Sequence, residues 1–353
     1  MPVKKLSVTD FIHLSENQIV LDVRSPSEYA QAHIPCAYSL PLFDDEERKV
    51  VGTAYKQRSR EQAIKAGLDF FGPKMRPMVE TVENLLKAGK VNGKVIYIHC
   101  WRGGMRSGAV AWLLDLYGFD VFLLAGGYKS FRNWVLAQFE KDFPIKILGG
   151  FTGSGKTPIL HGLKESGEKI IDLEGLANHK GSAFGGIDQP EQPRQEMFEN
   201  LLSIALDKQS RETCRNHIWL EDESQRIGKL NIPTQLWENI RSKKVYFIDI
   251  PFAERLKYIT QEYGQLNKER LQDAILRIQK RLGPLETKTA IAFIKEDNFS
   301  EAFKILLQYY DKLYLKALHN RQQIDKLLLT IDCETVDTLK NVQNILACET
   351  VSI

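Results

Sequence analysis

The chain has 353 residues, long enough for two domains with a core each, and its 43% hydrophobic and 26% charged residues are typical of a globular protein. A net charge of +3 is close to neutral for this length, so a surface that binds nucleic acid has to be a local basic patch. No apolar run approaches the length of a signal-peptide core or a membrane span, so we expect no membrane partner.

The cysteines form an odd-numbered set without Cys-x-x-Cys spacing. This argues against a disulfide framework and against a structural metal site, and it favours a reducing compartment. We therefore expect a cytoplasmic protein with no structural metal. The five cysteines are Cys36, Cys100, Cys214, Cys333 and Cys348.

Residues 1–140 are predicted to form the first domain. Residues 18–23 have the composition of a strand, and serines in the turn that follows can cap a helix beginning near Glu28. Residues 43–90 form a charged, mostly helical stretch. We interpret its charge run, residues 44–49, as a solvated face, and the alternative is that it shapes the mouth of a site.

Cys100 follows a short apolar strand predicted at residues 95–98. Two glycines then allow a tight loop, and from Ser107 onward the apolar residues have helical spacing. A strand, a loop and a helix start in this order place a thiol among backbone N–H groups at the positive end of a helix. Two arginines in the loop would also favour the thiolate. Cys100 is therefore the candidate catalytic residue, and the alternative is an inert buried cysteine. The rest of the loop is Trp101, Arg102, Gly103, Gly104, Met105, Arg106 and Ser107.

This loop resembles the active-site loop of rhodanese (sulfurtransferase) domains, whose cysteine carries sulfur or selenium as a persulfide-type intermediate. Residues 21–35 resemble the Asp-Val-Arg…Glu-Tyr…His-Ile signature near the start of such domains, and residues 124–128 with Trp134 resemble their closing segment. Cys36 stands where the family usually has glycine. We assign it no chemical role, because it falls in a turn away from the loop.

Pro144 marks the start of a second domain, residues 141–353, because proline ends a helix and favours extended chain before it. An apolar strand at 145–148 then leads into a Gly-x-x-x-x-Gly-Lys-Thr pattern that precedes a helix. This context predicts a P-loop rather than a glycine-rich turn. The glycines let backbone N–H groups face a phosphate, the lysine supplies a cation, and the threonine supplies a hydroxyl for phosphate or Mg²⁺. The candidate diphosphate-binding residues are Gly150, Gly153, Ser154, Gly155, Lys156 and Thr157.

Strands and helices alternate after the P-loop, as in an α/β fold. We therefore predict an N-terminal rhodanese-like domain followed by a P-loop NTPase-like domain with a parallel sheet and a helical C-terminal part. A helix running from Phe303 to Leu318 has one wide apolar face, which we assign to the core. The other predicted strands are 169–172, 217–221, 245–250 and 326–331, and the other predicted helices are 192–206 and 252–263.

Two further segments of this domain are candidates for the site. An acidic run follows a strand at the position where a P-loop protein places a metal-binding or catalytic acid, and the alternative is an exposed acidic turn. A loop of small residues with a basic pair follows another strand and is a candidate substrate loop, although its histidine alone would more often be a surface residue. The residues are Glu221, Asp222 and Glu223 in the first segment and His179, Lys180, Gly181 and Ser182 in the second.

Arg277, Lys280 and Arg281 share one face of a predicted helix through their i, i+3 and i+4 spacing. We interpret them as a candidate contact for a nucleic-acid backbone, and solvation is the alternative. Because they lie far in sequence from the P-loop, we expect them to act apart from it. A competing basic patch in the first domain contains Lys56, Arg58 and Arg60.

Four motifs, at residues 100–107, 150–157, 181–185 and 221–228, closely resemble those of the tRNA 2-selenouridine synthase family, in the same order. The resemblance implies a transferase that geranylates the sulfur of the wobble 2-thiouridine of tRNA with geranyl diphosphate. It implies that the enzyme then replaces the geranylated sulfur with selenium from selenophosphate. The partners implied are tRNA and a selenophosphate-supplying enzyme. No tightly bound cofactor is implied, and Mg²⁺ is compatible with the P-loop. The oligomeric state is not readable from the residues.

Two other functions fit the same motifs, because nothing in a P-loop tells ATP or GTP from a prenyl diphosphate. One is a small-molecule kinase fused to a sulfurtransferase, and the other is a regulator that senses persulfide through Cys100. Bound RNA that ribonuclease removes from the purified protein would favour the tRNA enzyme over both.

Overall fold

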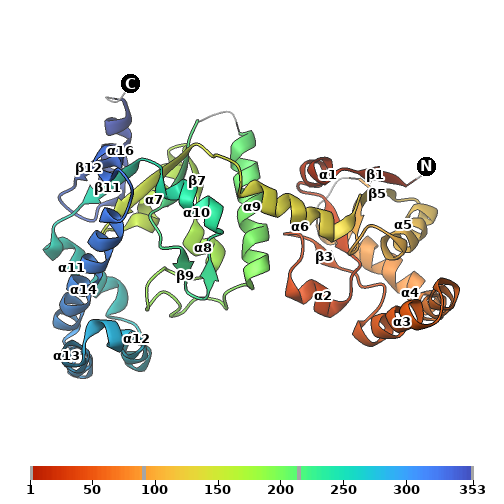
Figure 1. Cartoon of the computed structure of the whole chain (residues 1–353), viewed down its shortest axis with the longest axis horizontal. Helices are drawn as coiled ribbons and strands as arrows, with labels where there is room; N and C mark the ends of the chain where they lie inside the picture. The colour runs from red at the N-terminus through yellow and green to blue at the C-terminus, as the bar shows by residue number, and fades with distance from the viewer. Residues whose placement is uncertain (1–2, 90–92, 213–215, 351–353) are drawn as a thin grey trace. The chain divides into compact units, whose positions relative to one another are not determined.

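The computed structural model describes residues 3–89, 93–212 and 216–350 (Figure 1). The chain divides into two compact units. The first contains Met1–Gln138 with Glu199–Ile204, and the second contains Phe139–Phe198 with Ala205–Ile353. Each unit has its own five-stranded sheet, and every strand pair in these two sheets is parallel. No helix within the described ranges is long and apolar enough to cross a membrane.

The first sheet has the strand order β1-β5-β4-β2-β3. β4 lies between two neighbours and is covered on both faces, which explains its continuous apolar sequence. Its carboxyl end therefore holds Cys100 at the centre of the sheet edge. The elements of this unit are β1 (Lys4–Leu6), α1 (Val8–Leu14), β2 (Ile19–Asp22), α2 (Pro26–Gln31), β3 (Tyr38–Ser39), α3 (Asp45–Gln57), α4 (Arg60–Ala88), β4 (Val95–His99), α5 (Met105–Tyr117), β5 (Asp120–Leu124) and α6 (Gly127–Gln138).

Helices α3 and α4 form the charged stretch before β4 and pack against each other. Asp44 caps α3 by accepting from the Glu47 backbone N–H at 2.8 Å. On α4, Phe71 and Val82 join the core cluster that also contains the β4 strand. Every residue of the charge run except Glu47 is exposed, as expected for a solvated face, and caps and ion pairs also tie the run into the fold. Arg48 and Lys49 line a cavity, so the alternative that the run shapes the mouth of a site applies to these two residues.

The second sheet has the order β12-β11-β6-β8-β7, with the strand that enters the P-loop in the middle. The carboxyl ends of parallel strands meet at one edge, where ligand sites form in open α/β sheets. The elements are β6 (Ile145–Gly150), α7 (Lys156–Glu165), β7 (Lys169–Ile171), α8 (Leu173–Ala177), α9 (Gln195–Arg211), β8 (Ile218–Glu221), β9 (Arg226–Ile227), β10 (Leu230–Asn231), α10 (Thr234–Arg241), β11 (Val245–Asp249), α11 (Phe252–Tyr263), α12 (Lys268–Leu282), α13 (Pro284–Lys295), α14 (Phe299–His319), α15 (Ile324–Leu327), β12 (Leu328–Asp332) and α16 (Thr338–Thr350).

Helices α11 to α14 form a helical subdomain with a core of its own. The α14 residues Phe303, Leu306 and Leu307 are buried in that core, as the helical spacing of the apolar residues predicted. The predicted fold class is confirmed, and the predicted strands of both sheets lie within two residues of the observed ones. Cys36 is exposed and has φ of 65°, a backbone conformation that favours glycine. Cys214 lies outside the described residues.

Candidate functional site

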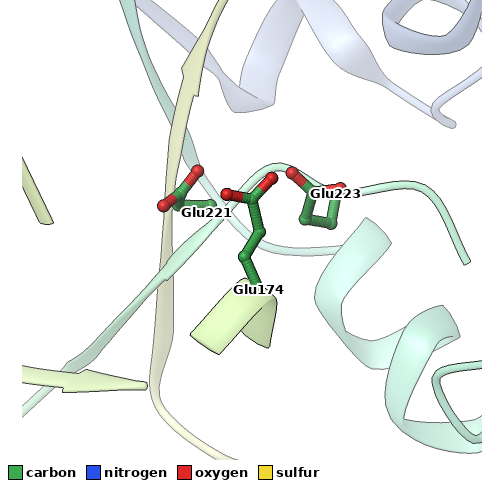
Figure 2. A group of neighbouring side chains, drawn as sticks. All are labelled: Glu174, Glu221 and Glu223. Carbon is green, nitrogen blue, oxygen red and sulfur yellow. The ribbon is translucent and has the colours of Figure 1, made fainter. Parts of the chain in front are cut away.

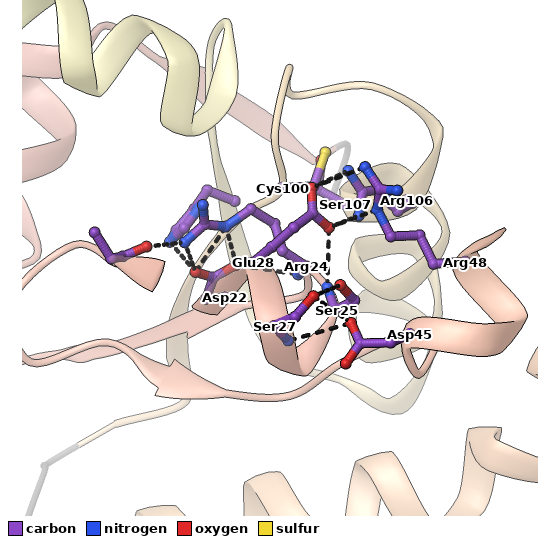
Figure 3. A network of polar contacts seen from close by, with 12 residues as sticks. Asp22, Arg24, Ser25, Ser27, Glu28, Asp45, Arg48, Cys100, Arg106 and Ser107 are labelled. Carbon is purple, nitrogen blue, oxygen red and sulfur yellow. Dashed lines mark hydrogen bonds and ion pairs between the residues drawn. The ribbon is translucent and has the colours of Figure 1, made fainter. Parts of the chain in front are cut away.

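Cys100 lies directly after β4 and is buried, with 3% of its surface exposed. Its sulfur is 3.2 Å from the hydroxyl oxygen of Ser107, which is in the first turn of α5 (Figure 3). The backbone N–H of Tyr128 donates to the Cys100 carbonyl at 2.8 Å, and that of Lys129 donates to the Trp101 carbonyl at 3.0 Å. A Cβ at Gly127 would lie 2.4 Å from the Cys100 oxygen, so only glycine lets these two segments meet. The closing segment therefore holds the shape of the cysteine loop.

The sequence suggested that Arg106 stabilises the thiolate with a free positive charge, but in the structure Arg106 is bound to a carboxylate. Its guanidinium donates to Glu28 at 2.7 Å, and Arg48 donates to the same carboxylate at 3.0 Å (Figure 3). Burial opposes ionisation of Glu28, but Arg106, the backbone N–H of Ser25 and Arg48 together outweigh it and lower the pKa of Glu28 to about 2. Arg102 is exposed on the loop and is the remaining candidate cation of the motif.

A buried ion pair supports the loop from below. Arg24 Nη2 donates to Asp22 at 2.6 Å and to the Ala32 carbonyl at 2.7 Å, and its guanidinium carbon lies 3.8 Å from the ring centroid of Tyr128. Burial would raise the pKa of Asp22, but His99 and Arg24 lower it overall. The Asp-Val-Arg signature thus fixes the ring of Tyr128 and, with it, the segment that cradles Cys100.

In the second unit, the predicted P-loop runs from the end of β6 to the start of α7. Gly155 has φ of 70° and a Cβ there would lie 2.8 Å from Val336, so the turn into α7 requires glycine. Lys156 begins α7, and its ammonium group donates to the Gly150 carbonyl at 3.1 Å. The hydroxyl of Thr157 donates to Glu174 at 3.2 Å. A helix N-terminus and a lysine thus face one cavity, which is an arrangement that binds phosphate.

Three glutamates meet beside the P-loop, and their oxygens lie within 4.8 Å of one another. Figure 2 shows Glu174 between Glu221 and Glu223. Burial raises the pKa of all three, that of Glu221 to about 8, and the charge of Glu174 adds to the effect at the other two while Lys156 opposes it. Within the described chain, Glu221 Oε1 is buried without a hydrogen-bond partner. Such a cluster holds either protons or a hard cation that takes oxygen ligands.

Asp222 does not belong to this cluster, although the sequence grouped it with its neighbours. It accepts a hydrogen bond from the hydroxyl of Tyr314 at 2.8 Å and pairs with Arg321. The Tyr314 hydroxyl in turn accepts from the Gly150 backbone N–H at 3.2 Å. Asp222 therefore ties α14 to the P-loop, and its place in the cluster is taken by Glu174.

The candidate substrate loop lies on the same cavity as the P-loop, which has a volume of about 1810 Å³ and is lined by His179, Lys180, Gly181 and Ser182. The loop approaches the acidic cluster closely, since a Cβ at Gly181 would lie 2.7 Å from Glu223 and 2.8 Å from Glu174. Burial and the charge of Arg277 lower the pKa of His179. The structure thus brings the loop, the P-loop and the acidic cluster together.

The basic trio on α12 is divided by this cavity. Arg277 and Arg281 line it together with the P-loop residues, whereas Lys280 is exposed elsewhere on the helix. The expectation that all three act apart from the P-loop was therefore wrong, because α12 folds back over residues that precede it by more than a hundred positions. Of the competing patch in the first unit, Lys56 lines a separate cavity beside Cys100.

Comparison with known proteins identifies both units. The family model described as tRNA 2-selenouridine synthase AAA domain matches residues 143–343, and the rhodanese-like domain model matches residues 7–133. The chain belongs to the tRNA 2-selenouridine synthase family. The tRNA 2-selenouridine synthase of Hydrogenovibrio crunogenus is 35% identical, covering 87% of this chain and 91% of the relative. The tRNA 2-selenouridine synthase of Nitrosomonas europaea is 31% identical, covering 86% of this chain and 90% of the relative. That of Shewanella frigidimarina is 33% identical, covering 88% of this chain and 91% of the relative.

Membership of the tRNA 2-selenouridine synthase family confirms the resemblance of the four motifs. Two features of this family member were missed by sequence reasoning. Glu174 follows the predicted strand at 169–172, and its position at a strand end was the only signal for it. An aromatic and apolar wall of the P-loop cavity carried no motif, since its residues come from three helices: Tyr258, Ile259, Tyr263, Ile278, Tyr309, Tyr310 and Leu313.

Proposed function

We propose that this protein is a tRNA 2-selenouridine synthase that works in two steps. The first step attaches a geranyl group from geranyl diphosphate to the sulfur of a 2-thiouridine in tRNA, in the P-loop unit. The second replaces the geranylated sulfur with selenium from selenophosphate, in the unit that holds Cys100. The observation that supports this best is a phosphate-binding loop whose cavity also has a wall of aromatic and apolar side chains, because a prenyl diphosphate has one charged and one apolar part.

In geranyl transfer, the sulfur of the thiouridine forms a bond to C1 of the prenyl chain, and the bond from C1 to oxygen breaks. Diphosphate leaves with the electron pair, and the base loses its proton from nitrogen. The N–H groups at the start of α7 and the ammonium of Lys156 would stabilise the charge on the leaving group. The tyrosine rings would hold the chain and stabilise positive charge that develops at C1.

The acidic cluster fits a divalent cation such as Mg²⁺, because its donors are all oxygens and Glu221 Oε1 is buried without a hydrogen-bond partner in the described structure. Glu174, Glu221 and Glu223 would hold the ion, with the hydroxyl of Thr157 beside Glu174. Bound there, the ion would supply positive charge for the diphosphate. Glu174, Glu221 and Glu223 would then be ionised, because a cation reverses the effect of burial on their pKa.

In selenium transfer, the selenium of selenophosphate forms a bond to C2 of the base, the bond from C2 to sulfur breaks, and geranylthiolate leaves and takes up a proton. Water then attacks phosphorus and the bond from phosphorus to selenium breaks, which releases phosphate and leaves 2-selenouridine. Selenium in selenophosphate is already at the oxidation level of selenide, so this exchange needs no oxidant. We assign the step to Cys100, whose thiol lies at the start of α5 beside the Ser107 hydroxyl. The N–H groups at that helix start would stabilise negative charge on the sulfur.

The test is to supply the two co-substrates separately. Purified protein, a tRNA with 2-thiouridine and geranyl diphosphate should yield a geranylated nucleoside, and selenophosphate added afterwards should convert it to 2-selenouridine, as followed by mass spectrometry. Consumption of ATP with phosphorylation of a small molecule and no change in the nucleoside would instead favour the kinase.

The tRNA contact is proposed at α12, where the basic residues divide into two groups. Alanine at Lys280 should weaken tRNA binding and flatten the log–log salt dependence by about one unit, because one phosphate contact releases about one counterion. Alanine at Arg277 or Arg281 should also raise the KM for geranyl diphosphate, because both residues line the P-loop cavity. If none of the three substitutions altered the salt dependence of tRNA binding, the result would favour a tRNA contact at Lys56, Arg58 and Arg60 instead.

A further inference from the structure

A second cavity, of about 740 Å³, lies in the first unit beside Cys100. Helices α3 and α4 form one side and the cysteine loop forms the other, so the insertion before β4 builds a wall of the site. Several apolar side chains that line the cavity are left open to solvent instead of being packed in the core, as is typical of an interaction surface. These are Tyr55, Ile64, Leu68, Trp101 and Met105.

The charged residues at this cavity are all basic. Among the described residues that line it there is no aspartate or glutamate, and the cations are Arg48, Lys49, Lys56, Arg102 and Arg106. Arg48 and Arg106 both donate to Glu28, which does not line the cavity. A polyanion that carries an apolar group matches both the basic residues and the apolar walls. Selenophosphate alone matches only the basic residues, because it has no apolar part.

We propose that this cavity binds the geranyl chain of S-geranyl-2-thiouridine while the sulfur is replaced at Cys100. The inference rests on the proposed function and adds a second prenyl site to it. The chain would bind first as a diphosphate in the P-loop cavity and then as a thioether against α3 and α4. The volume of the cavity beside Cys100 lies in the usual range of small-ligand pockets, about 300–1,000 Å³.

Such a site is needed because the reacting thioether by itself gives the enzyme little to bind. A thioether on a pyrimidine offers few hydrogen bonds, whereas each methylene buried in an apolar cavity strengthens binding about fourfold. Holding the chain against Ile64 and Leu68 would fix the bond between sulfur and C2 near the Cys100 thiol. The geranyl group would then be a recognition element that distinguishes the intermediate from unmodified tRNA.

The test compares two substrates for the second step alone: a tRNA anticodon stem-loop with S-geranyl-2-thiouridine and the same stem-loop with S-methyl-2-thiouridine. With selenophosphate, wild-type protein should convert the geranyl substrate with a kcat/KM at least about 100-fold higher. The double variant Ile64→Gln, Leu68→Gln should reduce this ratio to below about 10-fold, mainly through the KM of the geranyl substrate. Both side chains are exposed on α4, so glutamine there should leave the fold intact.

Leu116→Gln is the matched control, because Leu116 is a helical leucine with 69% exposure that does not line the cavity. It should keep the wild-type ratio, and geranylation by all three proteins should be the same. Equal rates for the two substrates with wild-type protein would overturn the proposal while leaving the proposed function standing. A double variant that slows both substrates equally would overturn it too. Failure of wild-type protein to selenate either substrate would overturn the proposed function, and the second prenyl site with it.

Discussion

Replacing Lys156 with alanine should slow geranylation without slowing selenation. Lys156 is the first residue of α7 and is half-buried, and its ammonium reaches over the P-loop to the Gly150 carbonyl at 3.1 Å. The variant loses one charge-assisted contact to a diphosphate, worth about 1.5–3 kcal/mol, which corresponds to about 10- to 160-fold in kcat/KM. The N–H groups at the start of α7 remain, so the activity should fall but not vanish.

Geranylation is measured with 2-thiouridine tRNA at low geranyl diphosphate, and selenation is measured with tRNA that has already been geranylated. Lys164→Ala is the control, because Lys164 is exposed in the last turn of the same helix. It should leave both rates unchanged. Equal losses in the two half-reactions of Lys156→Ala would refute the reasoning, since they would mean that the P-loop supports the fold or the selenium donor.

Three further substitutions test other parts of the two sites. Cys100→Ser should abolish selenation and spare geranylation, and a variant that still formed selenouridine would rule the thiol out. Gly127→Ala should destabilise the protein by at least about 2 kcal/mol in denaturant unfolding, because its Cβ would meet the Cys100 carbonyl, whereas Gly108→Ala has open space and should stabilise it slightly. Burial keeps Glu221 protonated up to a pKa of about 8 when folded, against 4.5 as the ordinary value, so with a chelator present the free energy of unfolding should fall as the pH rises between these values. Glu221→Gln should flatten that fall, and Mg²⁺ at pH 8 should stabilise the wild-type protein more than the variant. If the free energy of unfolding had the same pH dependence in wild-type protein and in Glu221→Gln, Glu221 would not be the group that titrates.

The parts of the fold that sequence predicted well are those with strong local patterns. Strand β4 is a continuous apolar run, helix α11 has a helical apolar periodicity over its whole length, and the predicted helix 252–263 has the observed bounds. The P-loop was predictable because its glycines stand at positions where the backbone geometry requires them, as the left-handed conformation of Gly155 shows. Local chemistry was enough in these places.

The parts that sequence did not predict depend on contacts between distant segments. Arg106 meets Glu28 across 78 positions, so the sequence showed a free arginine where the structure has a bound one. The cavity beside Cys100 needs α3 and α4 to lie against the cysteine loop, and the stretch that forms them looked like solvated helix because its charges stood out more than its apolar face. The tyrosine wall of the other cavity comes from helices that carry no motif.

The acidic run lies between these two cases, because the information that divides it was present in the sequence. β8 ends at Glu221, but the Asp222 backbone N–H still donates to the Leu148 carbonyl at 2.9 Å, so the chain remains extended beside β6. In extended chain, residues two apart share a face and the residue between them faces the opposite way. Glu221 and Glu223 therefore turn to the P-loop while Asp222 turns to Tyr314. The strand period could have separated these carboxylates in advance, whereas the third member, Glu174, required the fold.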